Sequence, residues 1–267
     1  MSGVTVCGSL SRFPVSLGRS MHEAGYRALG LDWMYAPFAC VDVADAVRGM
    51  RALSIRGLGV SMPFKLDVIP HLDAITDQSR RIGAVNTLVN DGGVVTGHNT
   101  DALGATAALA EVVDLDGAKV LLLGAGGAAR AVAFGLVDAG ATVTVANRSH
   151  EKAVELAQAS GAAHAGWDEA LASEHDVLVN ATSQGMAGVG LASPVPAACL
   201  RAGVVVMDIV YKPVETELAV TARARGATVI TGERMLLHQA MGPFRLYTSL
   251  EAPRAAMEAA LFAGLSR

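Results

Sequence analysis

The sequence predicts an α/β protein of two domains, with a mixed sheet in the N-terminal domain and a doubly wound parallel sheet in the C-terminal one. Short apolar runs of strand length alternate with helix-like amphipathic segments along most of the 267 residues, a pattern typical of sheets covered on both faces. A hairpin signal, Asn90-Asp91-Gly92-Gly93, interrupts the alternation in the first part. A glycine-rich turn over residues 124–128 opens a second β/α series.

We expect the N-terminal domain to span residues 1–102, with residues 239–267 packing back onto it. Its predicted strands are short and apolar: Val4–Cys7, Trp33–Phe38, Gly57–Val60, Ala84–Val89 and Val94–Gly97. Its predicted helices are amphipathic: Arg19–Leu29 and Val43–Leu53. Because Asp-Gly and Gly-Gly between β-prone runs favour a tight antiparallel turn, the last two strands should pair and make this sheet mixed.

The C-terminal domain is expected over residues 103–238, and its boundary rests on the change of motif near residue 102. A connecting helix is predicted at Thr100–Val113, followed by a turn at residues 114–117. The predicted strands are Lys119–Leu123, Thr142–Ala146, Val177–Asn180, Val204–Ile209 and Thr228–Ile230. Within the first of them, Val120–Leu123 is an unbroken apolar run, as in a buried parallel strand. Two terminal helices, Arg234–Tyr247 and Ala252–Leu261, close the prediction.

Composition excludes several classes of function. Hydrophobic residues make up 52% of the chain and charged residues 17%, as in a folded globular protein. The net charge is −4 with both signs interspersed, so no nucleic-acid partner is expected. The three cysteines are scattered and odd in number, which favours buried thiols in a reducing compartment. With no basic head of a signal peptide at the first residues, we expect a cytoplasmic location.

Neither a membrane span nor a metal site is expected. The stretch Val177–Leu200 is uncharged and long enough to cross a bilayer, but it contains Asn, Thr, Ser, Gln, glycines and two prolines. A lipid-facing helix would have to satisfy those groups internally, so we do not predict membrane insertion. The seven histidines show no ligand spacing, so no metal is predicted.

A glycine-rich turn follows the apolar run Val120–Leu123 at once and precedes a helix-like segment. Glycine permits the tight turn and lets backbone approach a pyrophosphate, and the helix presents its free N–H groups to that anion. A Rossmann-like dinucleotide site is therefore predicted from the strand, turn and helix together. Its phosphate-binding residues are expected to be Gly124, Ala125, Gly126, Gly127 and Ala128. A turn that serves packing alone is the structural alternative.

The residues that end the next predicted strand indicate which dinucleotide binds. An NAD site would place Asp or Glu there to hold the ribose 2′-hydroxyl. Here the sequence reads Asn147-Arg148-Ser149, and no carboxylate occurs until Glu151. Arginine offers a cationic fork to a phosphate, while Asn and Ser offer neutral hydrogen bonds. NADP is therefore preferred over NAD. The alternative, compatible with it, is that Ser149 caps a helix and Arg148 is a solvated surface charge.

Lys65 and Asp101 each end a motif that precedes the dinucleotide unit: residues 59–65 read GVSMPFK, and residues 97–101 read GHNTD. Reduction of a carbonyl develops negative charge on its oxygen as hydride adds to carbon. An ammonium can stabilise that charge and deliver the proton, and a carboxylate can orient the ammonium. The alternatives are an ordinary exposed lysine that begins a helix, and an aspartate that serves as a helix N-cap.

These motifs, with the segment AVNTL at residues 84–88 and the glycine-rich turn, resemble the shikimate dehydrogenase family over nearly the whole chain. The resemblance implies an NADP-dependent enzyme of aromatic amino-acid biosynthesis. It would interconvert 3-dehydroshikimate and shikimate, or an analogue, as a monomer or homodimer, with no nucleic-acid or membrane partner. It also implies Lys65 and Asp101 as the catalytic pair.

The resemblance implies further site residues. Thr182, Ile209 and Gly232 would contact the cofactor beyond the two loops. The substrate contacts would be made by Ser16, Ser61, Asn86, Tyr211 and Gln239. Asn within an apolar run also requires a polar partner in its own right. For Tyr211 and Gln239 the alternative is hydrogen bonding between the domains.

One segment departs from the family pattern. The family holds the substrate carboxylate with a Ser-x-Ser-Pro pattern, whereas residues 16–20 read Ser-Leu-Gly-Arg-Ser, so Gly18 replaces the second serine. Loss of one hydrogen bond to an ionised group costs about 1.5–3 kcal/mol. Arg19 either pairs with the carboxylate or faces solvent. The departure resembles the divergent shikimate dehydrogenase-like branch.

Two alternatives to shikimate oxidation stay open at this point. The same chemistry on quinate or another shikimate-like hydroxy acid follows from the altered carboxylate segment. A non-catalytic sensor of NADP(H) or of a metabolite belongs to another class, since fold alone does not settle function.

Overall fold

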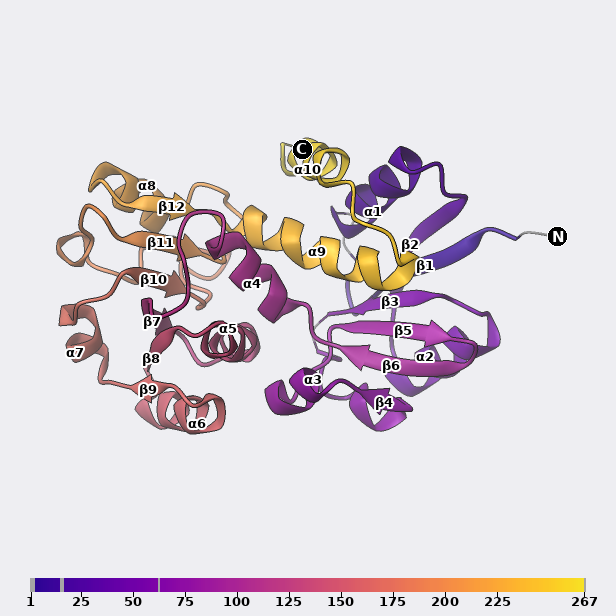
Figure 1. Ribbon diagram of the computed structural model, residues 1–267, viewed down its shortest axis with the longest axis horizontal. Coiled ribbons are helices and arrows are strands. Elements are labelled where there is room, and N and C mark those ends of the chain that lie inside the picture. The colour runs from indigo at the N-terminus through magenta and orange to yellow at the C-terminus, as the bar shows by residue number, and fades with distance from the viewer. Residues whose placement is uncertain (1–2, 15–16, 62, 267) are drawn as a thin grey trace. The chain divides into compact units, whose positions relative to one another are not determined.

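The computed structural model describes residues 3–14, 17–61 and 63–266. The chain divides into two compact units, Met1–Thr100 with Gln239–Arg267, and Asp101–His238. Each unit contains one six-stranded sheet with helices against it (Figure 1). The fold class predicted from the sequence is confirmed, because the first sheet is mixed and every strand pair in the second is parallel.

The first unit is built on a sheet of order β2-β1-β3-β5-β6-β4. Its strands are β1 (Thr5–Ser11), β2 (Trp33–Ala39), β3 (Gly57–Val60), β4 (Ala74–Ile75), β5 (Thr87–Asp91) and β6 (Val94–His98). Its helices are α1 (Leu17–Ala28), α2 (Val43–Ala52), η1 (Ile69–His71), α3 (Asp77–Ile82), the latter part of α9 (Gly232–Thr248) and α10 (Arg254–Leu265). The predicted hairpin joins β5 to β6 through Gly92 and Gly93, whose φ angles are 62° and 99°.

Glycines allow the helices of the first unit to pack closely. A Cβ added to Gly57 of β3 would lie 2.2 Å from the ring of Tyr247, and one added to Gly25 of α1 would lie 2.6 Å from Phe244. Aromatic side chains of α9 therefore lie directly on α1 and on the sheet. On the opposite face, Val47 and Met50 of α2 pack with Leu58 in a separate apolar cluster.

The second unit contains a parallel sheet of order β12-β11-β10-β7-β8-β9. Its strands are β7 (Lys119–Leu123), β8 (Thr142–Ala146), β9 (Ala163–His164), β10 (Val177–Asn180), β11 (Val205–Asp208) and β12 (Thr228–Ile230). Its helices are α4 (Asp101–Leu109), α5 (Gly127–Asp138), α6 (His150–Ser160), α7 (Trp167–Ala172), η2 (Ala197–Cys199), α8 (Glu217–Ala224) and the start of α9.

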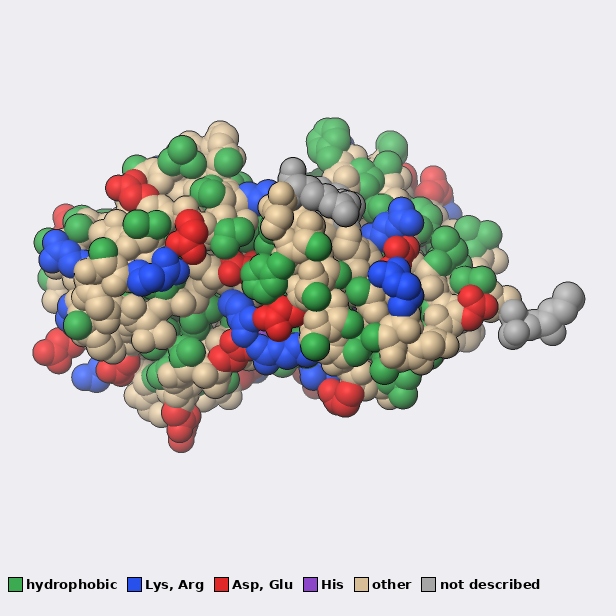
Figure 2. Space-filling view, turned by 90° about the horizontal axis from the view of Figure 1, so that it is seen from above, with side chains coloured by type: hydrophobic (Ala, Val, Ile, Leu, Met, Phe, Trp, Pro, Cys, Tyr) green, Lys and Arg blue, Asp and Glu red, His purple; other side chains and the backbone are tan. Residues whose placement is uncertain are grey.

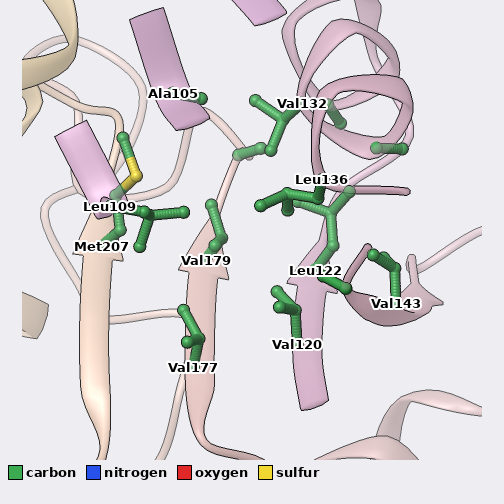
Figure 3. Packing of buried hydrophobic residues seen from close by; sticks show 14 of the residues in the cluster. Ala105, Leu109, Val120, Leu122, Val132, Leu136, Val143, Val177, Val179 and Met207 are labelled. Atoms are coloured by element: carbon green, nitrogen blue, oxygen red, sulfur yellow. The ribbon is translucent and has the colours of Figure 1, made fainter. Parts of the chain in front are cut away.

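Successive residues of the central strands face opposite layers of this sheet. Val120 and Leu122 join a cluster with α4 and α5, which Figure 3 shows around Leu109 and Val132. Leu121 joins a second cluster, on the other face, that includes residues of α7 and α8. Burial on both faces explains why these strands read as continuous apolar runs.

Several predicted bounds differ from the structure by one to four residues, and two of these differences concern the elements that contain or follow the AVNTL and GHNTD motifs. The expected strand Ala84–Val89 begins only at Thr87, because the Val85 N–H donates to the Lys65 carbonyl (2.9 Å) and so leaves the sheet. The connecting helix ends at Leu109 rather than Val113, and a turn follows it.

The uncharged stretch Val177–Leu200 forms β10, a loop and η2 rather than one helix. Among the residues that the structure describes, no helix combines the length and apolar character needed to cross a bilayer. On the face shown in Figure 2, acidic and basic side chains are interspersed with hydrophobic ones.

Candidate active site

The glycine-rich turn lies at the carboxyl end of β7, the strand between β10 and β8. Gly124 has a φ angle of 110°, and a Cβ there would lie 2.9 Å from the Ala181 carbonyl oxygen, so this position requires glycine. By contrast, a Cβ on Gly126 or Gly127 would meet no atom within 4 Å. The open side of these two glycines, at the N-terminus of the 12-residue helix α5, suits the close approach of a pyrophosphate.

A cavity of about 500 Å³ lies between this turn and the end of β8. It brings together residues of both predicted loops, and its lining is Ala125, Gly126, Asn147, Arg148, Ser149 and Lys152. The Asn147 amide fixes the second loop by donating to the Ser149 carbonyl (2.9 Å). Two cations and a serine hydroxyl around such a cavity fit the 2′-phosphate of NADP.

Lys152 was not predicted from the sequence. It lies three residues after Ser149, close to one turn into α6, so it shares the face of the helix that borders the cavity. Counting one helical turn from the predicted cap would have found it. Ser149 does occupy the N-cap position, but its side chain makes no capping hydrogen bond, so the capping alternative is only half right.

Beyond β7, the predicted cofactor contacts Thr182, Ile209 and Gly232 follow β10, β11 and β12. A Cβ on Gly232 would lie 2.6 Å from the Ile209 carbonyl oxygen, which places the two residues in direct contact. Tyr211 lies two residues further along the same loop and is half-buried. A dinucleotide lies across the carboxyl ends of the strands at the point where their order reverses, so the predicted nicotinamide contacts and the phosphate-binding turn lie at the same edge of the sheet.

A buried hydrogen-bond network, not predicted from the sequence, holds these loops. The Asp208 carboxylate, 1% exposed, accepts from the Asn180 amide (2.9 Å), the Thr216 hydroxyl (2.7 Å) and the Val210 N–H (3.1 Å). The Asn180 side-chain oxygen accepts in turn from the Thr182 hydroxyl (2.7 Å). Burial raises the pKa of Asp208 above its ordinary value. The network fixes the backbone that carries Thr182 and Ile209.

In the first unit, Ser61 and Lys65 belong to the turn that follows β3. The Phe64 N–H donates to the Ser61 carbonyl (3.0 Å), and the Phe64 ring is buried in the apolar cluster beneath. Lys65 is half-exposed. The buried Phe64 ring anchors the chain next to Lys65 and so holds the backbone of that lysine in place.

Asn86 is buried, and its side-chain oxygen is a structural acceptor. It accepts from the Thr100 N–H (2.8 Å), the Thr87 hydroxyl (2.9 Å) and the Thr100 hydroxyl (3.2 Å). These bonds hold the residue that directly precedes Asp101. The polar partners that the sequence required for Asn86 therefore include Thr87 and Thr100. The prediction that Asn86 lies within the strand was wrong, because β5 begins at Thr87.

Asp101 is the first residue of α4 and is 4% exposed. By these helix bounds Thr100 directly precedes the helix, and the N-cap role of Asp101 stays an untested alternative. Asp101 begins the second unit, whereas Lys65 lies in the first, as does Gln239, which is half-buried in α9.

The carboxylate-binding segment is described from Leu17 onward, and Ser16 lies outside the described residues. Gly18 lies in the first turn of α1, and a Cβ there would stand 3.7 Å from the Tyr35 hydroxyl, an ordinary contact. Arg19 donates to Glu23 (2.9 Å) and its side chain is 55% exposed. Arg19 thus faces solvent in this structure, and its pairing with a substrate carboxylate stays an untested alternative. Across the described residues, no group of three or more His, Cys, Asp or Glu side chains could hold a metal ion.

Comparisons with known proteins cover nearly the whole chain. Residues 12–88 match the family model for the shikimate dehydrogenase substrate binding domain, and residues 106–224 match that for shikimate / quinate 5-dehydrogenase. The shikimate dehydrogenase (NADP(+)) of Halorubrum lacusprofundi is 46% identical, over 94% of this chain and 95% of that protein.

Two solved structures resemble the model closely. Shikimate 5-dehydrogenase from Thermus thermophilus, in complex with NADP(H) and shikimate, has a TM-score of 0.91 and 36% identity, covering 98% of this chain and 100% of that one. Ligand-free 5-ketofructose reductase of Gluconobacter sp. strain CHM43 has a TM-score of 0.90 and 34% identity, covering 98% and 99%. Identity at these levels along both units means that the chain belongs to the shikimate dehydrogenase family.

Proposed function

We propose that this protein is an NADP-dependent shikimate dehydrogenase, which interconverts 3-dehydroshikimate and shikimate. The observation that carries the proposal is the cavity at the end of β8, where Arg148, Ser149 and Lys152 lie beside the open side of the phosphate-binding turn. A dinucleotide with a 2′-phosphate needs both features at once. The 46% identical relative is named for the same cofactor and substrate.

The proposed cofactor-binding residues belong to the second unit, and most of the proposed substrate-binding residues belong to the first. The second unit would hold NADP, with residues 124–128 on the pyrophosphate and Asn147, Arg148, Ser149 and Lys152 on the 2′-phosphate. Thr182, Ile209 and Gly232 would border the nicotinamide half. The first unit would bind the substrate through Ser16, Ser61, Asn86 and Gln239, with Tyr211 contributed by the second.

The chemistry assigned to the chain is proton transfer. NADPH, when bound, supplies the hydride to the ketone carbon. The Lys65 ammonium stabilises the negative charge that develops on the ketone oxygen and donates the proton to it. The role proposed for the Asp101 side chain is to orient that ammonium and to accept a hydrogen bond from a substrate hydroxyl. In the reverse direction Lys65 takes the proton from the shikimate hydroxyl.

Replacement of Lys65 tests this assignment. Lys65→Ala should lower turnover about a hundred- to ten-thousandfold, while the dissociation constant for NADP, measured by calorimetry, stays within about twofold because Lys65 lies in the other unit. Lys119→Ala is a matched control, because Lys119 is an exposed lysine at the start of β7, the end of that strand away from the turn. Undiminished turnover in Lys65→Ala would refute the role of this lysine.

A second substrate class is favoured by a specific observation. Gly18 offers no hydroxyl and Arg19 is engaged by Glu23, so neither supplies the carboxylate with the hydrogen bond that the second serine of the family provides. A substrate without a carboxylate, such as an uncharged polyhydroxy ketone, does not need that hydrogen bond, whereas quinate, which has the same carboxylate as shikimate, does. The solved relative named 5-ketofructose reductase has this fold. Relative kcat/KM values for shikimate, quinate and 5-ketofructose decide between them.

Three finer assignments stay predictions: the divergent branch of the family, a monomer or homodimer, and a cytoplasmic location. The free thiols of Cys7 and Cys40, both buried, support a reducing compartment.

A further inference from the structure

The start of α6 holds a carboxylate beside the cavity that we assign to the 2′-phosphate. The Ser149 hydroxyl lines this cavity, yet it donates a hydrogen bond to the Glu151 carboxylate (2.9 Å). Ser149 sits at the N-cap of α6 without accepting the usual capping bond. Its hydroxyl is thus held by Glu151 rather than by the helix.

Glu151 is exposed, and its charge is that of a carboxylate at neutral pH. The backbone N–H of Glu151 and the Ser149 hydroxyl lower the pKa of this carboxyl below its ordinary value. On the same short segment, Arg148 and Lys152 contribute two positive charges. The site therefore combines two cations that attract a phosphate with one anion that repels it.

The two nicotinamide dinucleotides respond to this arrangement in opposite ways. A 2′-phosphate carries close to two negative charges at neutral pH and cannot accept a hydrogen bond from Ser149 while Glu151 holds that hydroxyl. The ribose 2′-hydroxyl of NAD carries no charge and can donate to a carboxylate, the bond that NAD sites obtain from an Asp or Glu at this end of the strand.

We propose that Glu151 sets the balance between NADP and NAD in this protein: it weakens the preference for NADP that Arg148 and Lys152 create, by repelling the 2′-phosphate and by occupying the Ser149 hydroxyl. The inference rests on the proposed NADP site and goes beyond it, since it assigns the selectivity to one residue outside the cavity lining. The wild-type protein then binds NAD measurably as well as NADP.

Direct binding of both dinucleotides tests the proposal without reference to turnover. Glu151→Gln removes the charge but keeps an acceptor for Ser149, whereas Glu151→Ala removes both. Calorimetry at low salt measures both dissociation constants where screening is weakest. Glu151→Gln should tighten NADP about three- to tenfold and leave NAD unchanged or weaker, and raised salt should shrink the gain. Glu151→Ala should tighten NADP at least as much.

A matched control lies on the same helix. Glu155 is exposed and one turn further from the cavity, so Glu155→Gln removes an equal charge and should change the NADP dissociation constant less than about twofold. A double substitution isolates the hydroxyl: Ser149→Ala should cost more NADP affinity in the Glu151→Ala background than in the wild type, because only there is the hydroxyl available to the phosphate.

Several results would overturn the inference. The first is an NADP dissociation constant of Glu151→Gln that lies within about twofold of the wild-type value. The second is that Glu151→Gln binds both NAD and NADP more tightly by the same factor. The third is that Glu155→Gln changes NADP affinity as much as Glu151→Gln does. Any of them would leave the proposed function standing, provided the wild type binds NADP. A wild-type protein that binds neither dinucleotide would overturn the proposed function and this inference together.

Discussion

The two ends of the proposed dinucleotide site in residues 101–238 differ in the burial and charge of their polar side chains. At the end of β8 the polar groups are charged and largely exposed: Arg148, Lys152 and Glu151. At the ends of β10 and β11 they are buried and joined by short hydrogen bonds, with Asn180 0% and Asp208 1% exposed. Exposed charges interact with a bound dinucleotide through solvent and salt, which screen them, so their removal changes its affinity but contributes little to the stability of the fold. Buried groups left without a partner cost stability.

We therefore expect the end of β8 to determine which dinucleotide binds, and the ends of β10 and β11 to determine the stability of the loops. Substitutions at the end of β8 should alter which dinucleotide binds and leave the free energy of unfolding nearly unchanged. Substitutions in the Asp208 network should lower that free energy and, through the loops that carry Thr182 and Ile209, lower affinity for either dinucleotide.

The largest effect is expected from Asp208→Ala. The substitution leaves the donors on Asn180, Thr216 and Val210 without their acceptor, at a cost of about 2–4 kcal/mol in the free energy of unfolding. Asp208→Asn should cost only about 1 kcal/mol, because the Thr216 hydroxyl can turn and accept from the new amide. Urea denaturation measures both, and a loss below about 1 kcal/mol in Asp208→Ala would contradict the importance of the network.

Asn90 in the first unit supplies the control for that experiment. Its buried side chain also makes three hydrogen bonds, to the Ile55 and Met50 carbonyls (3.1 and 3.3 Å) and from the Gly93 N–H (2.8 Å). Asn90→Ala should be destabilising to a similar degree but leave dinucleotide affinity unchanged below the unfolding transition. Equal loss of affinity in both variants would mean that general destabilisation, not the loops, is responsible.

Arg148→Ala should act on affinity alone. Removal of a charge-assisted contact to the 2′-phosphate costs about 1.5–3 kcal/mol, a ten- to hundredfold rise in the NADP dissociation constant, with much less change for NAD. Arg225, exposed at the end of α8, provides a control arginine far along the chain. A comparable loss for NAD, or a fall in the thermal midpoint, would place Arg148 in the structure rather than at the phosphate.

Two glycines of the phosphate-binding turn allow the effects on stability and on dinucleotide affinity to be compared within one loop. Gly124→Ala introduces a Cβ 2.9 Å from the Ala181 carbonyl oxygen at a positive φ and should destabilise the fold by about 1–3 kcal/mol. Gly126→Ala meets no atom within 4 Å, so it should spare stability and weaken both dinucleotides by filling the approach to the pyrophosphate. Thermal unfolding with and without NADP distinguishes the two. Equal stability losses would show that Gly126 is also a structural requirement.

The pH dependence of stability gives the smallest predicted effect. Burial raises the pKa of Asp208 above 3.8, so the folded state favours the protonated form. Its contribution to stability is complete below 3.8 and is lost as pH rises through the folded-state pKa. The difference in unfolding free energy between wild type and Asp208→Asn should therefore fall with rising pH, by about 1.4 kcal/mol for each unit of pKa shift. A difference that stays flat or grows would contradict the direction of the shift.

The same contrast explains what could be read from the sequence. Four of the five strands predicted for the second sheet have the predicted bounds: Lys119–Leu123, Thr142–Ala146, Val177–Asn180 and Thr228–Ile230. Their short runs of Val, Leu, Ile and Thr favour strands. The turn and the cationic loop were readable because their chemistry is contiguous in the chain. The fold class was therefore predictable in full.

The Asp208 network was not predictable, because its members come from two strands and a helix cap. Asn180 and Thr216 lie 28 and 8 residues from Asp208, and nothing local marks them as partners. The elements β4 and α3 were also not predicted, because they are too short to show a hydrophobic period. Six residues of α3 are held by a cap from Thr76 and a left-handed Gly83 rather than by a hydrophobic period.

The measurement that tests the central claim most directly is the reduction of NADP by the wild-type protein with shikimate, followed by absorbance of the reduced nicotinamide. Quinate with NADP and 5-ketofructose with NADPH run as parallel substrates, and Lys65→Ala serves as the inactive comparison. We predict turnover with at least one of these substrates that requires Lys65. A protein that binds NADP tightly yet turns over none of them, with or without Lys65, would contradict the account and favour a non-catalytic NADP(H) sensor.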